Sequence, residues 1–98
     1  MTTFLITRHP GAVAWIAQQD LQIDIIQPHL DLAQIQSGDV VFGTLPINLA
    51  AAVCACGARF FNLSLDVPMH LRGKELSVDE LVRYHARLEE YHVEKLAC

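Results

Sequence analysis

Residues 3–12 read TFLITRHPGA, and this stretch sets the fold class because a strand pattern passes directly into a helix start. Its first five residues, 3–7, are largely apolar and β-prone, which predicts a short strand. Pro10 and Gly11 end that strand, and a helix is predicted from Ala12 to Gln19. A strand, a tight loop and a helix in this order are the repeating unit of parallel α/β sheets.

A second unit of the same kind lies in the middle of the chain. A turn at 37–39 precedes a predicted strand at Val40–Phe42, and the loop Gly-Thr-Leu-Pro at 43–46 follows it. The next segment has apolar residues at i, i+3, i+4 and i+7, namely Leu49, Ala52, Val53 and Cys56. Gly57 stands where a C-terminal cap belongs, so this is the clearest helix of the sequence.

Further segments complete an alternation of strands and helices. Ile23–Gln27 and Arg59–Leu63 are predicted strands, and 31–36 predicts a short helical turn. Ser77 and Glu80 form a capping-box pattern that opens a last helix. Its apolar stripe is predicted to contain Val78, Leu81, Val82, His85 and Leu88. The segment 91–96 either extends this helix or forms a final strand after a break near Glu90, and we favour the strand.

These elements predict one α/β domain over residues 1–98, with a mostly parallel sheet and flanking helices. Right-handed crossovers give 2-1-3-4 as the simplest strand order. The chain then reverses direction between strands one and three, and open parallel sheets bind ligands at the carboxyl ends beside such a point. The loops 8–11 and 43–46 leave these ends, so we expect the functional site there.

Both loops have the composition of an anion site. Each contributes a glycine that permits close backbone approach and a proline near a helix start. Free N–H groups of two helix N-termini would then face one spot, where phosphate is the anion most often bound. The alternative is a pair of ordinary tight turns. The expected ligand-binding residues of these loops are Pro10, Gly11, Ala12, Gly43, Thr44, Leu45 and Pro46.

Arg8 and His9 follow the first strand directly and are the expected catalytic residues. Arg8 can hold phosphate oxygens with its bidentate fork, and Thr44 can add a hydroxyl. His9 can act as a general acid or base because an imidazole titrates near neutral pH. A loop histidine is often merely structural, and this alternative stays open. His29, after the second strand, is a further candidate at the same edge.

The connection after the fourth predicted strand is basic although the protein is acidic. Residues 66–74 contain His70, Arg72 and Lys74, and such a segment can close over an anionic ligand. We expect Arg72 and Lys74 to bind that ligand. The alternative is a solvated loop held down by Met69 and Leu71.

Composition limits the classes of partner. The 98 residues include 7 Lys and Arg against 11 Asp and Glu, a net charge of −4, which argues against a grip on duplex nucleic acid. No stretch reaches the ~18 apolar residues of a membrane span, so we expect a cytoplasmic protein without a membrane partner. A chain this short buries too little surface to enclose a deep active site within one copy, which favours a site shared by two copies.

Three cysteines, Cys54, Cys56 and Cys98, do not predict a disulfide framework. Cys54 and Cys56 are two residues apart in a predicted helix and therefore point in different directions. No further Cys or His lies at zinc-ligand spacing. We expect neither a metal nor a cofactor.

The chain resembles, from end to end, a family of very small proteins of type III CRISPR systems, the sixteenth of the Csx series. The resemblance rests on Phe4–Ala12, on Gly43–Pro46 and on Leu63–Asp66 leading to Leu71–Gly73. The first motif is quite specific, whereas Gly-Thr-Leu-Pro is informative only at its position. The resemblance implies a Rossmann-like fold related to the CRISPR-associated (CARF) domains that bind cyclic oligoadenylates. It also implies a ring nuclease that degrades this messenger, above all cyclic tetraadenylate.

The composition is compatible with that activity. An RNA ring carries its own nucleophile, the 2′-hydroxyl, so a protein can cleave it without metal by holding that oxygen in line with the adjacent phosphate. Arg8 and the helix N-termini would stabilise charge on the phosphoryl oxygens, and His9 would move a proton. A symmetric ring also suits two copies of the same loops, so we expect a homodimer.

Two other classes stay open at this stage. A non-catalytic sensor or sponge would share all the binding features and lack only turnover. Histidine phosphatases also begin with a strand followed by Arg-His, and their histidine becomes phosphorylated. Here Pro10 stands where their motif has glycine, and the chain is short for their full site.

Overall fold

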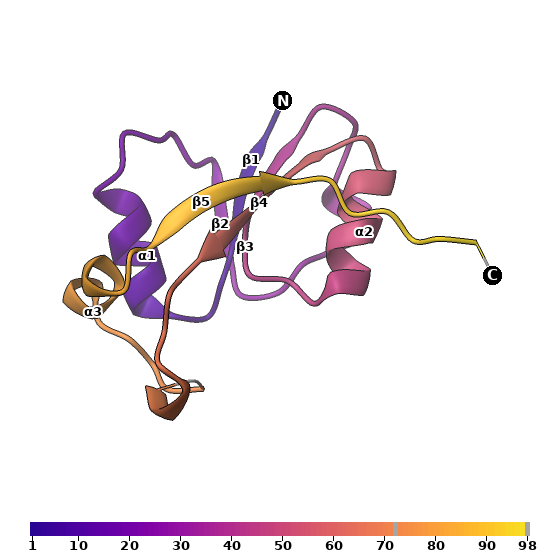
Figure 1. Ribbon diagram of the computed structural model, residues 1–98. Coiled ribbons are helices and arrows are strands. Elements are labelled where there is room, and N and C mark those ends of the chain that lie inside the picture. Colours follow the sequence, from indigo (N-terminus) through magenta and orange to yellow (C-terminus); the bar gives the residue numbers. More distant parts are fainter. Residues whose placement is uncertain (72, 98) are drawn as a thin grey trace.

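The computed structural model describes residues 1–71 and 73–97, and within them a five-stranded sheet forms the centre of the molecule (Figure 1). The spatial order is β2-β1-β3-β4-β5. The first four strands are parallel, and β5 runs antiparallel to β4. Their bounds are β1 (Thr3–Ile6), β2 (Ile25–Gln27), β3 (Val40–Gly43), β4 (Arg59–Ser64) and β5 (Arg87–Tyr91). The predicted fold class and the order 2-1-3-4 are confirmed, with an additional strand beside β4.

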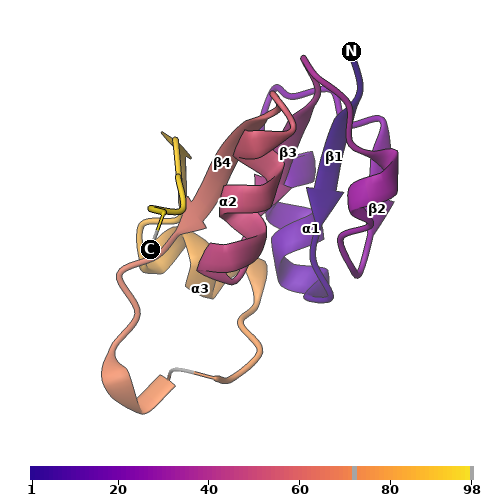
Figure 2. The same ribbon diagram turned by 90° about the vertical axis from the view of Figure 1, so that its right-hand side faces the viewer.

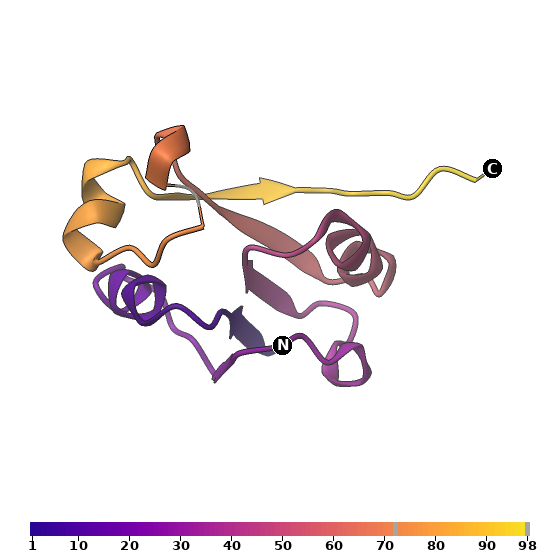
Figure 3. The same ribbon diagram turned by 90° about the horizontal axis from the view of Figure 1, so that it is seen from below.

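Helices cover both faces of the sheet. Figure 3 shows α1 (Pro10–Ala17) and α3 (Val78–Arg83) together on one face and α2 (Ile47–Ala55) on the other. Two short 3₁₀ turns, η1 (Leu32–Gln34) and η2 (Met69–Leu71), lie in the connections. None of the helices in residues 1–71 and 73–97 is long and apolar enough to cross a bilayer.

The core consists of two layers because successive strand residues point to opposite faces. The layer under α2 contains Phe4, Ile6, Val41, Ala50, Val53 and Phe60. The layer under α1 and α3 contains Leu5, Ala12, Trp15, Ile16, Phe42, Leu63 and Leu81. Burial on both faces explains why β1 and β3 are nearly continuous apolar runs.

The strand register aligns the carboxyl ends of three strands. Ile6 of β1 pairs with Gly43 of β3, and Gly43 pairs with Asn62 of β4. Figure 2 shows these strands ending at the same edge, with the connection after β4 extending beyond it. The loops after β1 and β3, expected to form the site, therefore lie side by side.

The last helix is shorter than the sequence pattern predicts, and the final strand begins earlier. α3 has the predicted capping box of Ser77 and Glu80 but ends at Arg83. His85 follows in a left-handed conformation (φ 59°) that turns the chain back toward the sheet. Leu88, expected on the helix stripe, instead lies in β5 opposite Leu63. Pairing β5 with β4 and packing Leu88 on the core outweighs helix extension, and Val82 is left exposed.

The predicted strand over 91–96 is therefore misplaced, since β5 ends at Tyr91 and residues 92–97 have no regular structure. This segment runs past α2, where Cys54 Sγ contacts the carbonyl of Tyr91 (3.8 Å) and the N–H of Val93 (3.4 Å). The buried face of α2 also differs, because Ala50 is buried in place of Cys56, which is exposed. Cys98 lies outside the described residues.

Candidate functional site

Three adjoining hollows lie along the carboxyl edge of the sheet, and Thr44 lines all of them. The histidine groove, of about 340 Å³, is lined by Thr7, Arg8, His9, Pro28, His29, Thr44, Leu45, Pro46 and neighbouring apolar side chains. The central hollow, of about 210 Å³, includes Thr7, His9, Ala12, Gly43, Thr44 and Lys74. The outer hollow, of about 490 Å³, includes Thr44, Asn62, Ser64, Leu65, Val67, Leu71 and Lys74.

The histidine groove brings together residues from three separate loops. Arg8 and His9 follow β1, His29 follows β2, and Thr44 with Pro46 follows β3. His9 and His29, far apart in sequence, thus line one groove beside an arginine. This juxtaposition follows from the strand order, which places β2, β1 and β3 next to one another.

The backbone around His9 is held by local hydrogen bonds. The N–H of His9 donates to Oγ1 of Thr7 (3.1 Å), and its extended backbone (φ −97°, ψ 114°) makes it the N-cap of α1. Its imidazole does not cap the helix, and the residue is exposed. The side chain is therefore available to a ligand while its backbone is fixed.

The two glycines are explained by packing within the chain. A Cβ on Gly11 would collide with the carbonyl oxygen of Leu76, where the connection before α3 crosses α1. A Cβ on Gly43 would lie 2.5 Å from the carbonyl oxygen of Ile6 on the neighbouring strand. Neither Pro10 nor Gly11 is among the described residues that line the three hollows.

The two helix starts differ in the donors that they offer. In α1, Pro10 has no N–H, and the N–H groups of Ala12 and Val13 both donate to the carbonyl of His9. In α2, Pro46 is the N-cap and accepts from the N–H groups of Leu49 and Ala50. The N–H groups of Ile47 and Asn48, the first two of α2, have no acceptor within the helix. The N-terminus of α2 therefore offers more donors to an anion than that of α1.

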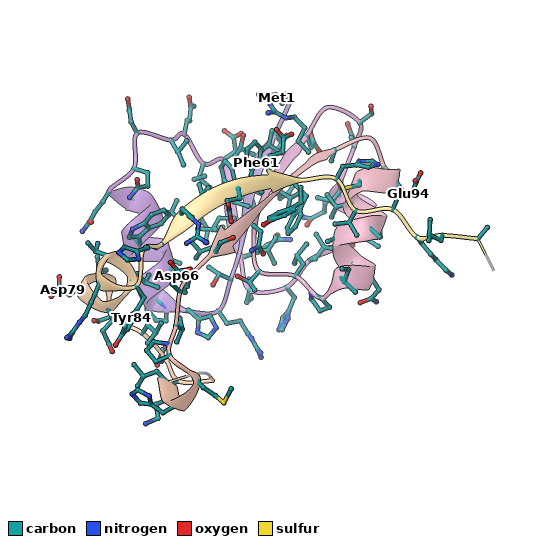
Figure 4. The ribbon with its side chains drawn as sticks, in the orientation of Figure 1. Met1, Phe61, Asp66, Asp79, Tyr84 and Glu94 are labelled. Atoms are coloured by element: carbon teal, nitrogen blue, oxygen red, sulfur yellow. The ribbon has the colours of Figure 1, made fainter. Side chains whose placement is uncertain are left out.

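The positive charges of the edge are not neutralised by carboxylates. Arg8 and Lys74 take no part in the ion pairs found in residues 1–71 and 73–97. The paired arginines lie instead on β4 and β5, where Arg59 binds Glu90 (2.8 Å) and Arg87 binds Asp66 (3.2 Å). Figure 4 shows Asp66 where the chain leaves β4, near the turn at Tyr84. The backbone N–H of Asp66 donates to the carbonyl oxygen of Tyr84.

Those β4–β5 pairs keep their carboxylates ionised. Hydrogen bonds from Arg87 and then His85 lower the pKa of Asp66, and the Arg59 guanidinium lowers the pKa of Glu90. Met69, expected to hold the connection after β4, is exposed, whereas Leu71 and Lys74 line the outer hollow. The expected contact of Arg72 lies outside the described residues.

Several lining residues were not expected from the sequence. The sequence pattern places Thr7 in the first strand, Asn62 in the fourth strand and Ser64 at the start of the connection after it. The signal for the last two was a pair of polar residues at alternate positions of an otherwise apolar strand. No group of three or more metal-ligating side chains is found among residues 1–71 and 73–97.

Comparison with known proteins identifies the family. Residues 4–94 match the model of the family described as "Putative CRISPR-associated protein (Cas_VVA1548)". The search of curated proteins and the search of solved structures gave no match. The matched range contains the whole sheet except Thr3, the first residue of β1, and it contains the whole candidate edge. This agrees with the resemblance to CRISPR-associated proteins of the Csx type. The chain therefore belongs to this CRISPR-associated family.

Proposed function

We propose that the protein is a ring nuclease, which binds a cyclic oligoadenylate and cleaves it to end type III CRISPR antiviral signalling. One observation carries the proposal. Arg8, His9, His29 and Lys74 converge on the three hollows, and no aspartate or glutamate is among the described residues that line them. In a protein with a net charge of −4, this segregation favours a small phosphodiester ligand at the edge.

The arrangement suits cleavage by the ligand's own 2′-hydroxyl. The 2′-oxygen attacks the adjacent phosphorus, the bond from phosphorus to the 5′-oxygen breaks, and a linear product with a 2′,3′-cyclic phosphate and a 5′-hydroxyl results. One proton leaves the 2′-oxygen and one reaches the 5′-oxygen. His9 and His29, which line the same groove, are the two groups that can move these protons.

The remaining edge residues would bind the phosphate. Arg8 and the N-terminus of α2 would stabilise negative charge as it develops on the phosphoryl oxygens. Thr44, present in all three hollows, would hold the phosphate between the histidine groove and the outer hollow. The ring supplies its own nucleophile, so the step requires no cofactor.

Cyclic tetraadenylate is the proposed substrate, and a homodimer is the proposed assembly. Two copies of the edge related by a two-fold axis would meet two symmetric halves of the ring. The test is incubation of the pure protein with labelled cyclic tetraadenylate. Linear fragments support the proposal, tight binding without fragments would indicate a sponge or sensor, and the absence of binding would contradict both.

A further inference from the structure

Asn62, half-buried on β4, belongs to a chain of hydrogen bonds beside the outer hollow. Its Nδ2 donates to Oγ of Ser64 over 2.9 Å. The side chain of Ser64 is also the largest cause that lowers the pKa of the Glu89 carboxyl. Glu89 lies on β5 directly opposite Asn62 and is also within 3.5 Å of the Arg87 guanidinium.

These interactions determine which way the Asn62 amide points. An ionised carboxylate can only accept, and Glu89 lies directly opposite Asn62, so it favours a Ser64 hydroxyl whose one hydrogen points toward the carboxylate. The Ser64 oxygen is then an acceptor for Asn62, and it must face the nitrogen of the amide rather than the oxygen. The amide keeps its oxygen, Oδ1, and its second N–H for another partner.

The amide lies within reach of the proposed phosphate site. Asn62 lines the outer hollow together with Thr44 and Lys74. It pairs in register with Gly43, the residue before Thr44, and a glycine puts no side chain beside the amide. Leu65, Val67 and Leu71 complete the hollow with apolar surface. The outer hollow thus combines a half-buried amide with apolar and polar surface in similar amounts, and a few placed polar groups beside apolar surface are what orient a small ligand.

Resting on the proposed function, we infer that Asn62 reads the nucleobase of the ring and selects adenine through its 6-amino group. Oδ1 accepts from the 6-amino group, and the second N–H donates to N7, the bidentate pairing that an asparagine side chain forms with adenine. Ser64 and Glu89 act as positioning residues because they prevent the amide from turning over.

Hypoxanthine is the sharpest competitor, because it differs in this pairing only by a 6-oxo group. With the amide locked, two acceptors would face each other, and an unpaired buried polar group costs enough to reduce binding by about tenfold or more. Turning the amide over would not rescue hypoxanthine, because Oδ1 would then face N7, which is also an acceptor. Without Ser64, however, the amide would have to be ordered when the adenine ring binds, and this would weaken the adenine ring selectively. The base preference therefore depends on Ser64 as well as on Asn62.

The test measures equilibrium binding of rings with 2′-deoxyribose, which cannot be cleaved in line, carrying either four adenines or four hypoxanthines. The parent protein should prefer the adenine ring by about tenfold or more. Asn62→Ala should bring the two affinities close together by weakening the adenine ring. Ser64→Ala should also reduce the preference, and Ser64→Thr, which keeps the hydroxyl, should restore it. Gln22→Ala, an exposed carboxamide in the loop before β2, is the control.

The outcomes separate this inference from the function on which it rests. Failure of the parent protein to bind the adenine ring would contradict both. Equal binding of the two rings by the parent protein, or an unchanged preference in Asn62→Ala, would overturn the base reading and leave the ring nuclease proposal standing. The comparison within the parent protein needs no variant, so a folding defect in Asn62→Ala cannot obscure the result.

Discussion

The backbone N–H of His9 donates to Oγ1 of Thr7 over 3.1 Å, so the last polar residue before the loop fixes the residue proposed to move a proton. Thr7 follows β1 immediately and is itself held at the sheet edge, since its N–H donates to the carbonyl of Gln27 (3.0 Å). The position of His9 is thereby tied to β1 and β2 together.

Thr7→Val tests this link, because valine has the shape of threonine but cannot accept the hydrogen bond. We expect cleavage to fall about 3- to 15-fold, the scale of one lost hydrogen bond, with a smaller change in ring affinity. Thr7→Ser keeps the acceptor and should retain most of the activity. Single-turnover rates and ring affinities of the parent protein and the two variants test whether Thr7 positions His9. A Thr7→Val protein as active as the parent protein would contradict this role.

His9→Ala tests the proton transfer itself. If His9 acts as general acid or base, ring binding should stay nearly intact while the single-turnover rate falls by about 10²- to 10⁴-fold. His92→Ala, on the exposed segment after β5, provides a matched control and should cleave at the parent rate. A His9→Ala protein that keeps the parent rate would shift the catalytic assignment to His29.

Arg8→Ala should impair binding and turnover together. The guanidinium is expected to contact the phosphate before the reaction and to bind it more tightly as charge develops, so its loss acts on both states. Arg8→Lys keeps the charge without the bidentate geometry and should recover binding better than rate. Titration of the ring followed by single-turnover cleavage measures both; a loss confined to the rate would contradict the ground-state contact.

Asp39 predicts how stability depends on pH. Hydrogen bonds from the N–H groups of Gln36 and Thr2, each 2.9 Å, hold its pKa below the ordinary value of 3.8. A carboxyl whose pKa is lower in the folded state stabilises the fold above its unfolded pKa and loses this effect as pH falls through the folded value. Asp39 itself is buried at the start of β3, where it joins the chain start to the turn at Gln36.

Asp39→Asn should therefore unfold at a temperature lower by roughly 5 °C or more at pH 7. The difference from the parent protein should shrink as pH falls below 3.8, because the unfolded chain is protonated there and the folded carboxyl is protonated in turn at its lower pKa. Thermal unfolding followed by circular dichroism, at pH 7 and at a pH below 3.8, measures this difference in unfolding temperature. Asp20→Asn, at an exposed position, is the control. A difference that stays constant with pH would show that the ionised carboxylate is not responsible.

The sheet order was predictable because its determinants are local. Glycine and proline mark the loops after β1 and β3, apolar runs mark the buried strands, and right-handed crossovers restrict the order. The end of α3 was not predictable in this way. Leu88 fits a helix stripe as well as a strand, and only its pairing opposite Leu63, a contact between segments distant in sequence, decides between them.

The convergence of several candidate residues at one edge was predictable in the same way. Arg8, His9 and Thr44 follow strand ends, and their convergence follows from the topology. Asn62 was not expected, because the role proposed for it also rests on Glu89 of β5, which pairs opposite it, and the sequence pattern placed Glu89 in a helix. The close packing of Gly11 against Leu76 likewise depends on a long-range contact, so a glycine expected to face a ligand is explained by the connection before α3.

Cleavage of cyclic tetraadenylate in excess EDTA tests the central claim most directly. Labelled ring, and the same ring with 2′-deoxyribose, are incubated with the parent protein, and the products are separated and identified. We predict linear fragments with 2′,3′-cyclic phosphate ends from the ribose ring, no fragments from the deoxyribose ring, and no effect of the chelator. Loss of cleavage in EDTA with recovery on adding metal, or cleavage of the deoxyribose ring, would contradict the in-line mechanism of the 2′-hydroxyl.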